Sequence, residues 1–387
     1  MQAGLSNVAV LQVLPSLVTG GVERGTVEIT RAIADAGGIA LVASAGGRMV
    51  AAVQRAGGRH VTLPLDSKNP LAICRNAALL ADVIRDERVA IVHARSRAPA
   101  WSAWLACRRT GARFVTTYHG TYGENLPFKR QYNAVMAKGE RVIVASRFIA
   151  ERIVARHGTD PARIRLIPRG VDPAVFNPDA VSGERIARLE RAWRLPEGAK
   201  VVLLPGRLTR WKGQTVLIEA LARLVRPDVC CLLVGSDQGR RHYAARLIRQ
   251  ADALGVADRL RLAGECDDMP GALMLADVVV HASTEPEAFG RVVIEAQAMG
   301  RPVIASDLGG PVETVEHGVT GWRVPPGDAG ALAAAIEQVL ELPAAVRADL
   351  GIRARAAVQR GYTVAAMQAA TLAVYDELLV GVAAVAA

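Results

Sequence analysis

The sequence predicts an α/β protein made of two doubly wound domains, and three observations support this. Short apolar runs alternate with amphipathic segments along most of the 387 residues, as expected for parallel sheets covered by helices. The alternation stops once, in a stretch rich in proline, glycine and charged residues, and then restarts. A chain of this length also exceeds the size at which a single core usually keeps growing, so two domains are expected.

The first domain is expected to span residues 1–172. Its strands are predicted from apolar runs at residues 8–13, 40–43, 60–63, 90–92, 113–117 and 141–145. Ser146 follows the last run and can cap a helix over residues 147–156, because a serine hydroxyl accepts a hydrogen bond from a free amide of the first turn. Residues 173–198 then interrupt the pattern with prolines and glycines around a charged helix, which is typical of a linker.

The second domain is expected at residues 199–361, and a helical stretch follows it at residues 362–379. Its strands are predicted at residues 200–204, 229–235, 259–263, 277–281 and 302–305. In open α/β sheets, ligands bind beyond the carboxyl ends of the strands. The loops that follow these strands are therefore the expected location of a binding site.

The composition favours a protein of the cytoplasm. Hydrophobic residues make up 51% of the chain, but no apolar run reaches the roughly 18 residues that span a bilayer. The first six residues lack the basic start and the apolar core of a signal peptide, so export is not expected. The five cysteines include no Cys-x-x-Cys pair, which indicates reduced thiols. The seven histidines are scattered, so no catalytic metal held by the protein is expected.

The positive charge is concentrated in the first half of the chain. Residues 1–180 hold 24 Lys or Arg against 13 Asp or Glu, whereas residues 181–387 hold 23 against 24. Codon bias would act on both halves, so this asymmetry favours an anionic partner for the first domain. Nucleic acid is not the expected partner, because no aromatic stacking platform accompanies the basic residues.

One candidate binding loop lies at residues 204–213, at the end of a predicted strand. Gly206 lets the backbone approach a ligand closely. Arg207 and Lys212 supply a guanidinium and an ammonium, which can neutralise a diphosphate without a metal ion. The loop therefore indicates phosphate binding, although a solvated basic turn has the same composition.

A second candidate site lies at residues 287–295, where two carboxylates are separated by seven residues. Glu287 is expected in a loop, and Gly290 is expected to begin a helix whose free backbone amides can meet an anion. Glu295 lies further along that helix. Glu285 is a second acid in the loop, but only Glu287 has this spacing to Glu295. The two carboxylates can accept hydrogen bonds from hydroxyl groups, and the start of the helix can bind phosphate. This combination suits a nucleotide-sugar.

Together the two motifs resemble the retaining glycosyltransferases of family 4, whose GT-B fold has two Rossmann-like domains facing a cleft. The resemblance covers nearly the whole chain, and Arg169 departs from it because the family commonly has Asn there. Further matches follow in the family's order: Gly20-Gly21-Val22-Glu23, His119-Gly120, residues 167–172, Gly309-Gly310-Pro311 and residues 318–321.

The resemblance implies roles for individual residues. Arg207 and Lys212 would hold the donor diphosphate, Glu287 the donor sugar and Glu295 the ribose, while His119 would support the sugar near the reaction centre. His119, Arg207, Lys212 and Glu287 are thus the catalytic candidates. The donor-binding candidates are Gly20, Gly21, Gly206, Glu265, Cys266, Phe289, Gly290, Arg291 and Glu295, among which the backbone around Glu265 and Cys266 would hold the base.

The resemblance also implies the reaction. The expected enzyme moves a sugar from a UDP- or GDP-linked donor to a hydroxyl acceptor with retention, without a cofactor, and the leaving phosphate takes the acceptor's proton. Residues 362–379 would cross back to pack on the first domain.

The acceptor is expected to be a glycan or glycolipid, as in lipopolysaccharide or other cell-envelope synthesis. Residues 118–132 interleave aromatic and basic side chains, and such a surface can lie on an anionic membrane, so peripheral attachment to the inner face of the plasma membrane is expected. An acceptor-binding loop packed against the domain is the simpler interpretation of these residues.

Other activities remain open on the same motifs. A soluble acceptor, or a nucleotide-sugar epimerase or phosphorylase on the same fold, would reuse the diphosphate site. A phosphorylase would need a lysine for pyridoxal phosphate, and the chain has few lysines. A non-catalytic nucleotide-sugar sensor would not need the whole donor set.

Overall fold

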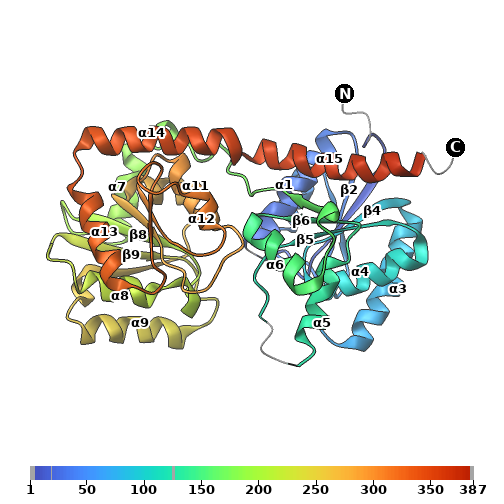
Figure 1. The fold of residues 1–387 in the computed structure, drawn as a ribbon, viewed down its shortest axis with the longest axis horizontal. Helices are drawn as coiled ribbons and strands as arrows, with labels where there is room; N and C mark the ends of the chain where they lie inside the picture. The colour runs from blue at the N-terminus through green and yellow to red at the C-terminus, as the bar shows by residue number, and fades with distance from the viewer. Residues whose placement is uncertain (1–4, 19, 124–126, 384–387) are drawn as a thin grey trace. The chain divides into compact units, whose positions relative to one another are not determined.

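The computed structural model describes residues 5–18, 20–123 and 127–383. The chain forms two compact units, unit 1 with residues 1–168 and 364–387 and unit 2 with residues 169–363. Each contains one parallel sheet with helices against it (Figure 1). The prediction of two doubly wound α/β units is confirmed. The prediction that the chain lacks a signal peptide rests on the first six residues, and residues 1–4 of these lie outside the described residues.

Unit 1 has a seven-stranded sheet in the order β3-β2-β1-β4-β5-β6-β7. The strands are β1 Ala9–Val13, β2 Ile39–Ser44, β3 Arg59–Thr62, β4 Val89–Ala94, β5 Arg113–Tyr118, β6 Arg141–Val144 and β7 Ile164–Leu166. The helices are α1 Gly21–Asp35, α2 Val50–Arg55, α3 Pro70–Asp86, α4 Arg97–Thr110, α5 Lys129–Asn133, α6 Arg147–His157 and α15 Val364–Ala383. Ser146 caps α6 as predicted, accepting from the amide of Ile149.

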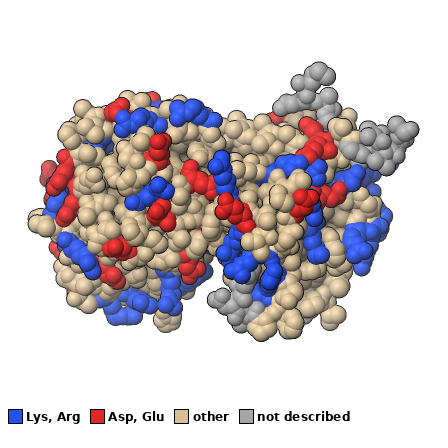
Figure 2. All heavy atoms as spheres, in the orientation of Figure 1, with Lys and Arg blue, Asp and Glu red and all other residues tan. Residues whose placement is uncertain are grey.

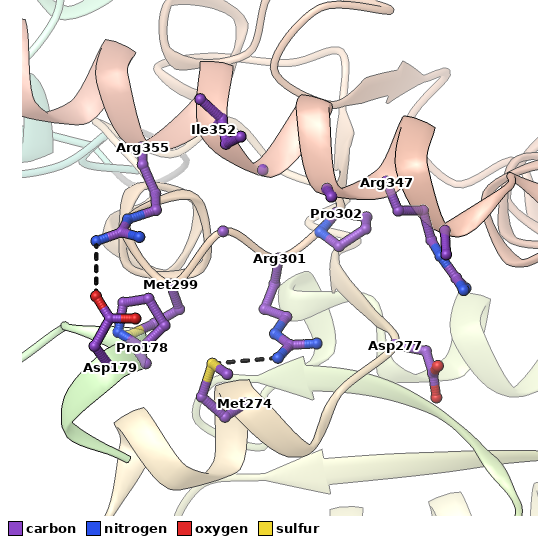
Figure 3. A pocket seen from close by; sticks show the side chains of 14 residues that line it. Pro178, Asp179, Met274, Asp277, Met299, Arg301, Pro302, Arg347, Ile352 and Arg355 are labelled. Atoms are coloured by element: carbon purple, nitrogen blue, oxygen red, sulfur yellow. Dashed lines mark hydrogen bonds and ion pairs between the residues drawn. The ribbon is translucent and has the colours of Figure 1, made fainter.

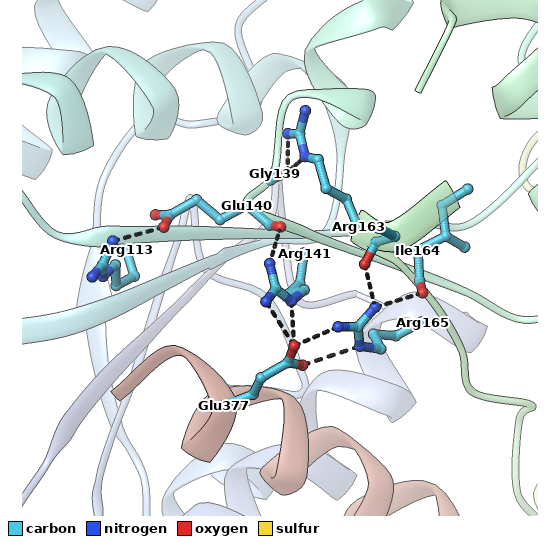
Figure 4. A network of polar contacts seen from close by, with 9 residues as sticks. Arg113, Gly139, Glu140, Arg141, Arg163, Ile164, Arg165 and Glu377 are labelled. Carbon is cyan, nitrogen blue, oxygen red and sulfur yellow. Dashed lines mark hydrogen bonds and ion pairs between the residues drawn. The ribbon is translucent and has the colours of Figure 1, made fainter. Parts of the chain in front are cut away.

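Helix α15, the last helix of the chain, docks on unit 1 beside α1 (Figure 1). The Tyr375 ring is fully buried, and its hydroxyl lies 2.7 Å from His93 Nδ1. Glu377 bridges Arg141 on β6 and Arg165 on β7 (Figure 4). The hydrogen bonds from these two guanidinium groups lower the pKa of Glu377 to about 2, so its carboxylate is charged near neutral pH.

Unit 2 has a six-stranded sheet in the order β10-β9-β8-β11-β12-β13. The strands are β8 Lys200–Pro205, β9 Val229–Val234, β10 Leu260–Gly264, β11 Val278–His281, β12 Val303–Ser306 and β13 Trp322–Val324. The helices are α7 Gly183–Ala192, α8 Gln214–Leu221, α9 Arg241–Ala253, α10 Met269–Leu275, α11 Arg291–Ala298, α12 Pro311–Thr314, α13 Ala329–Glu341 and α14 Ala344–Gly361.

The segment predicted as a linker, residues 173–198, folds as part of unit 2, which begins at Arg169. Its helix α7 packs against α10, and Arg185 Nε donates to Asp268 Oδ2 at 2.9 Å. Leu189 on the same helix is buried. The charged, proline-flanked pattern therefore belongs to a surface helix with one apolar side rather than to a free connection.

Across the described ranges, no single helix is both long and apolar enough to cross a bilayer. The pair α13 and α14 meets the requirement of length and composition only when taken together, and the two are bent by 110°.

Candidate functional site

The two motifs predicted to bind a ligand meet because their strands are neighbours. β8 and β11 pair in parallel, with Val202 opposite Val278 and Leu203 opposite Val279. Their carboxyl ends therefore lie at the same edge of the unit 2 sheet. Lys212, in the loop after β8, and Glu287, in the loop after β11, come into contact there although 75 residues separate them in the chain.

Glu287 is the centre of a compact polar cluster in which three side chains meet one carboxylate oxygen. Lys212 Nζ donates to Oε1 at 2.5 Å, His281 Nε2 lies 2.8 Å from it, and the Ser283 hydroxyl also donates to it. The side chains of Lys212 and Glu287 are only 13% and 12% exposed. In the described part of the chain no hydrogen bond reaches Oε2, so this second oxygen is available to a ligand.

The cluster keeps Glu287 ionised. Burial alone raises the pKa of this carboxyl group, because the charged form loses its water. The positive charge of Lys212, the electrostatic contribution of His281 and the hydrogen bonds from both oppose this, and the pKa ends well below its ordinary value. An ionised carboxylate only accepts hydrogen bonds. Glu287 is therefore suited to hold hydroxyl groups and not to act as a general acid at neutral pH.

Two glycines allow the backbone around the Glu287 cluster to pack this closely. Gly213 has a φ of +74°, and a Cβ there would lie 1.8 Å from the carbonyl oxygen of Ala282. Gly290 has a φ of +77°, and a Cβ there would lie 2.9 Å from Pro311 Cγ and 3.4 Å from His281 Nε2. A side chain at Gly213 would push the loop after β8 away from the loop after β11. A side chain at Gly290 would push the start of α11 away from Pro311 and His281.

The backbone of Glu287 is fixed from the other side. It forms a parallel bridge with Gly309, and the amide of Gly310 donates to the carbonyl oxygen of Glu287 at 2.9 Å. These glycines belong to the Gly309-Gly310-Pro311 match found in the sequence. The position of the carboxylate is thus set by backbone contacts as well as by its own hydrogen bonds.

Helix α11 begins where the sequence predicts, with Gly290 as its N-cap residue. Glu295 lies within the helix and is 7% exposed, with its Oε1 3.8 Å from Arg291 Nε. Phe289 is buried, and its ring centroid lies 5.8 Å from that of Tyr362. Glu295 is therefore a second buried carboxylate on the element that follows Glu287.

The loop after β8 holds its two cations differently. Lys212 Nζ lies 4.5 Å from the centre of the Trp211 ring as well as against Glu287. The Arg207 side chain is exposed, while its carbonyl oxygen accepts from Gln214 Nε2 at 2.9 Å. Gly206 precedes it at the strand end. Lys212 is thus preorganised, whereas Arg207 is free to move toward a ligand.

The predicted base-binding residues lie further along the same sheet edge. Glu265 and Cys266 follow β10, which is separated from β8 by β9. Glu265 is exposed. Cys266 is half-buried, and burial raises the pKa of its thiol, which therefore stays neutral near pH 7. They thus follow a strand that is two positions from β8 and three positions from β11 in the sheet.

The remaining candidates belong to unit 1. Gly20 is the N-cap residue of α1 and Gly21 is its first residue, while His119 follows β5 directly. β1 and β5 flank β4, so these residues lie at the carboxyl edge of the unit 1 sheet. His119 is partly buried, next to the buried Tyr118. The candidates therefore form one group on each sheet.

Sequence reasoning missed His281 and Ser283, which hold Glu287 in place. The scattered positions of the histidines along the chain concealed the role of His281. The available signal was its position: it is the last residue of β11, six residues before Glu287.

Within the residues that the structure describes, no group of three His, Cys, Asp or Glu side chains is arranged to hold a metal ion.

Comparison with known families finds two matches that together cover most of the chain. The family described as Glycosyltransferase Family 4 matches residues 19–175, and the family described as Glycosyl transferases group 1 matches residues 186–357. The second match contains the whole Lys212–Glu287 cluster, and the first contains His119.

Individual proteins extend this similarity. A crystal structure of a glycosyltransferase from Rickettsia africae is 36% identical, with a TM-score of 0.89 over 96% of this chain and 99% of that one. Anabaena HepE in complex with UDP-glucose is 25% identical, with a TM-score of 0.84 over 95% and 98%. D-inositol 3-phosphate glycosyltransferase of Mycobacterium tuberculosis is 32% identical over 308 residues, which are 74% of this chain. The match spans 62% of the length of that relative.

Proposed function

Since this chain belongs to the family 4 glycosyltransferases, we propose that it transfers a hexose from a uridine-diphosphate sugar to a hydroxyl group of an acceptor. The observation behind this proposal is the Lys212–Glu287 contact. It places a fixed ammonium beside an ionised carboxylate that keeps one oxygen open. In a nucleotide-sugar the hydroxyl groups of the sugar lie next to the phosphates. Glu287 can accept from a hydroxyl group, and Lys212 can bind a phosphate. The complex of HepE with UDP-glucose supports uridine as the base and a hexose as the sugar.

Arg207 and Lys212 would offset the charge that develops on the leaving diphosphate. Two unit charges about 4 Å apart attract each other by up to ~4 kcal/mol at an effective dielectric of about 20. Each cation therefore supplies a substantial part of the stabilisation, and the backbone amides at the start of α11 add to it. We propose that the enzyme needs no divalent metal for this reason.

Glu287 would hold hydroxyl groups of the donor sugar through Oε2, and Glu295 would hold the ribose. Oε1 of Glu287 is already in contact with the polar groups of Lys212, His281 and Ser283. These contacts largely compensate the charge of the carboxylate, so Glu287 is a poor nucleophile. We therefore propose the front-face course of a retaining transfer. The bond from the anomeric carbon to phosphate breaks, the acceptor oxygen bonds to the same face, and its proton passes to the phosphate.

The test is a donor screen under metal-free conditions. Release of free sugar from UDP- and GDP-linked hexoses is measured without acceptor, with and without excess chelator. We expect turnover of a UDP-hexose that persists in chelator. Loss of turnover in chelator and its return with magnesium or manganese would contradict the metal-independent mechanism. A preference for GDP-sugars would overturn the choice of base, and donor binding without any turnover would favour a sensor.

For the acceptor, we propose a glycan or glycolipid of the cell envelope, reached by an enzyme that stays in the cytoplasm and attaches to the membrane surface. The excess of basic residues in the first half supports this. The aromatic side chains of residues 118–132 differ in how exposed they are. Tyr118 is buried, and Tyr122 packs under Arg97 with 4.3 Å from its Cζ to the ring centre, whereas Phe128 is 79% exposed beside the exposed Arg130.

Figure 2 shows acidic side chains interspersed with basic ones on both units, so charge alone does not define a broad membrane surface on this face. We therefore expect Phe128 to matter for attachment, because an exposed ring beside a cation buries its apolar face at the lipid boundary. Sedimentation should show binding to anionic but not neutral vesicles, weakening with salt. Phe128→Ser should reduce the bound fraction several-fold, whereas Leu71→Ser, at another exposed apolar residue of unit 1, should not. Equal absence of binding to both vesicle types would favour a soluble acceptor.

A further inference from the structure

Unit 2 contains a cavity of about 470 Å³ at the edge of its sheet opposite the Lys212–Glu287 cluster (Figure 3). Asp277 and Pro302 line it, and each immediately precedes a strand, β11 and β12 respectively. Glu287 instead follows β11. Since the strands are parallel, residues before them and residues after them lie at opposite edges of the sheet. The cavity is therefore separate from the proposed donor site.

Three arginines line this cavity. Arg347 and Arg355 extend from α14 on one wall, and Arg301 extends from the loop before β12 toward Met274 (Figure 3). Among the residues with a described placement, the one ionic partner of Arg355 is distant: Asp179 at 3.9 Å, whose side chain is 81% exposed. Three guanidinium groups around one cavity repel one another unless negative charge lies between them.

The second carboxylate of the cavity, Asp277, does not balance the other two arginines. Asp277 is engaged by Lys200 Nζ at 3.2 Å and by the amide of Val201 at 2.9 Å. Among the residues that the structure describes, no carboxylate lies within ion-pair distance of Arg301 or Arg347. Two positive charges thus face the same space without a paired anion.

The Arg301 side chain is half-buried, and its hydrogen bonds are weak. Its Nη2 donates to the Met274 thioether at 3.2 Å, and its Nη1 lies 3.4 Å from the Ala276 carbonyl oxygen. Its Nε has no partner within the described chain. Burial lowers the pKa of Arg301, and the nearby charge of Arg347 lowers it further while Asp277 opposes the change. A half-buried guanidinium with weak acceptors gains from an added anion.

We propose that this cavity binds a small organic phosphate, with the phosphate group between Arg301 and Arg347 and its carrier against Met299 and Ile352. A phosphate monoester carries nearly two negative charges at neutral pH, which matches two unpaired guanidinium groups. Arginine forks bind phosphate oxygens in pairs. The volume lies in the range of small-molecule sites, and the apolar part of the lining accommodates a carbon skeleton. This site goes beyond the proposed transferase function and does not depend on it.

Phenyl phosphate is a suitable probe, since it combines a phosphate monoester with an apolar ring. Spectra of the full chain labelled at its methionine methyl groups report where it binds. Met274 and Met299 line the cavity, whereas Met136 and Met367 are buried in unit 1. We expect saturable shifts of the Met274 and Met299 signals, unchanged signals from the other two, and no effect of phenol at equal concentration.

Variants locate the phosphate. Arg347→Gln should weaken phenyl phosphate binding at least tenfold, because a charged hydrogen bond is lost. Arg360→Gln removes the same charge from the same helix outside the cavity and should leave the affinity unchanged. The Arg301 side chain donates hydrogen bonds within unit 2, so its replacement risks a structural change. Arg347 is therefore the better position for the test.

A further variant separates the two sites. Lys212→Gln removes the donor-site cation and no residue of the cavity, and unchanged Met136 and Met367 signals show that the variant is folded. Shifts of Met274 and Met299 that persist in it support a second site. Equal affinity of the wild type and Arg347→Gln would overturn the proposal. So would shifts at Met274 and Met299 that phenol also produces, or their loss in Lys212→Gln.

Discussion

Glu287→Ala is expected to lower the turnover number by roughly 10³-fold, while the affinity for a nucleotide diphosphate stays the same or becomes slightly tighter. Glu287 is ionised and keeps Oε2 open, so its loss removes contacts to the sugar and not to the phosphates. Lys212 donates to the same carboxylate, and removal of the carboxylate frees the ammonium for the diphosphate. The two effects together separate turnover from nucleotide binding.

Glu295→Ala should have the opposite profile. A buried carboxylate that receives ribose hydroxyls contributes about 1.5–3 kcal/mol through charged hydrogen bonds, so the dissociation constant for UDP should rise tenfold or more. Calorimetric titration with UDP and steady-state transfer rates measure both variants. Glu285→Ala is the matched control, because this exposed acid lies in the same loop and should change neither quantity. Identical effects of the two main changes on UDP affinity would disprove the division of roles.

The strands inside both sheets were predictable because parallel strands with helices on both faces are continuous apolar runs. All five residues of β1 and all six of β9 are buried, and such runs are visible in a sequence. β7 and β13 were missed. Each has three residues and lies at a sheet edge, and three residues establish no pattern. Their pairing with β6 and β12 is a property of the folded sheet.

The candidate site was predictable as a set of residues but not as an arrangement. Lys212 was assigned to the phosphate and Glu287 to the sugar, which treats them as separate contacts. Only the adjacency of β8 and β11 reveals that they form an ion pair. The roles of His281 and Ser283 were not predicted for the same reason. Both contact Glu287 only because the loop after β11 folds back on the end of the strand.

The aromatic residues of the 118–132 segment illustrate another limit. Their alternation with basic residues suggested a continuous exposed surface. Tyr118 is instead buried with its ring centroid 4.6 Å from that of Tyr122, and the Tyr132 carbonyl oxygen accepts from Trp101 Nε1 at 3.0 Å. Side chains in an irregular segment follow no period that would separate inward from outward positions. Part of this segment, residues 124–126, lies outside the described residues.

Lys212→Met is expected to lower turnover roughly 10²- to 10³-fold and also to reduce the free energy of unfolding by about 2–3 kcal/mol near pH 7. The loss of turnover follows from the missing cation at the leaving diphosphate. The loss of stability follows because Glu287 is left largely buried with less compensation, and burial then raises its pKa. Lys200→Met removes a lysine paired with Asp277 at the opposite sheet edge and should leave turnover unchanged.

The pH dependence of this stability loss identifies its cause. In the wild type the pKa of Glu287 is below its unfolded value of 4.5, so its contribution is present above that value and disappears as the pH falls. Lys212→Met removes the charge and the hydrogen bond of Lys212, while burial still raises the pKa of Glu287, so we expect this pKa to rise. The ionised Glu287 should then destabilise the variant at neutral pH and cease to do so once it is protonated. The difference in unfolding free energy, measured with urea, should therefore be larger at pH 7 than at pH 4.

A double variant then distinguishes a catalytic cation from one needed only for folding. Lys212→Met combined with Glu287→Gln leaves no buried charge without a partner, so it should recover most of the lost stability. It should recover none of the turnover, because the cation for the phosphate and the carboxylate for the sugar are both missing. If turnover returned together with stability, Lys212 would be a structural partner of Glu287, and Arg207 would remain as the side chain to neutralise the leaving diphosphate.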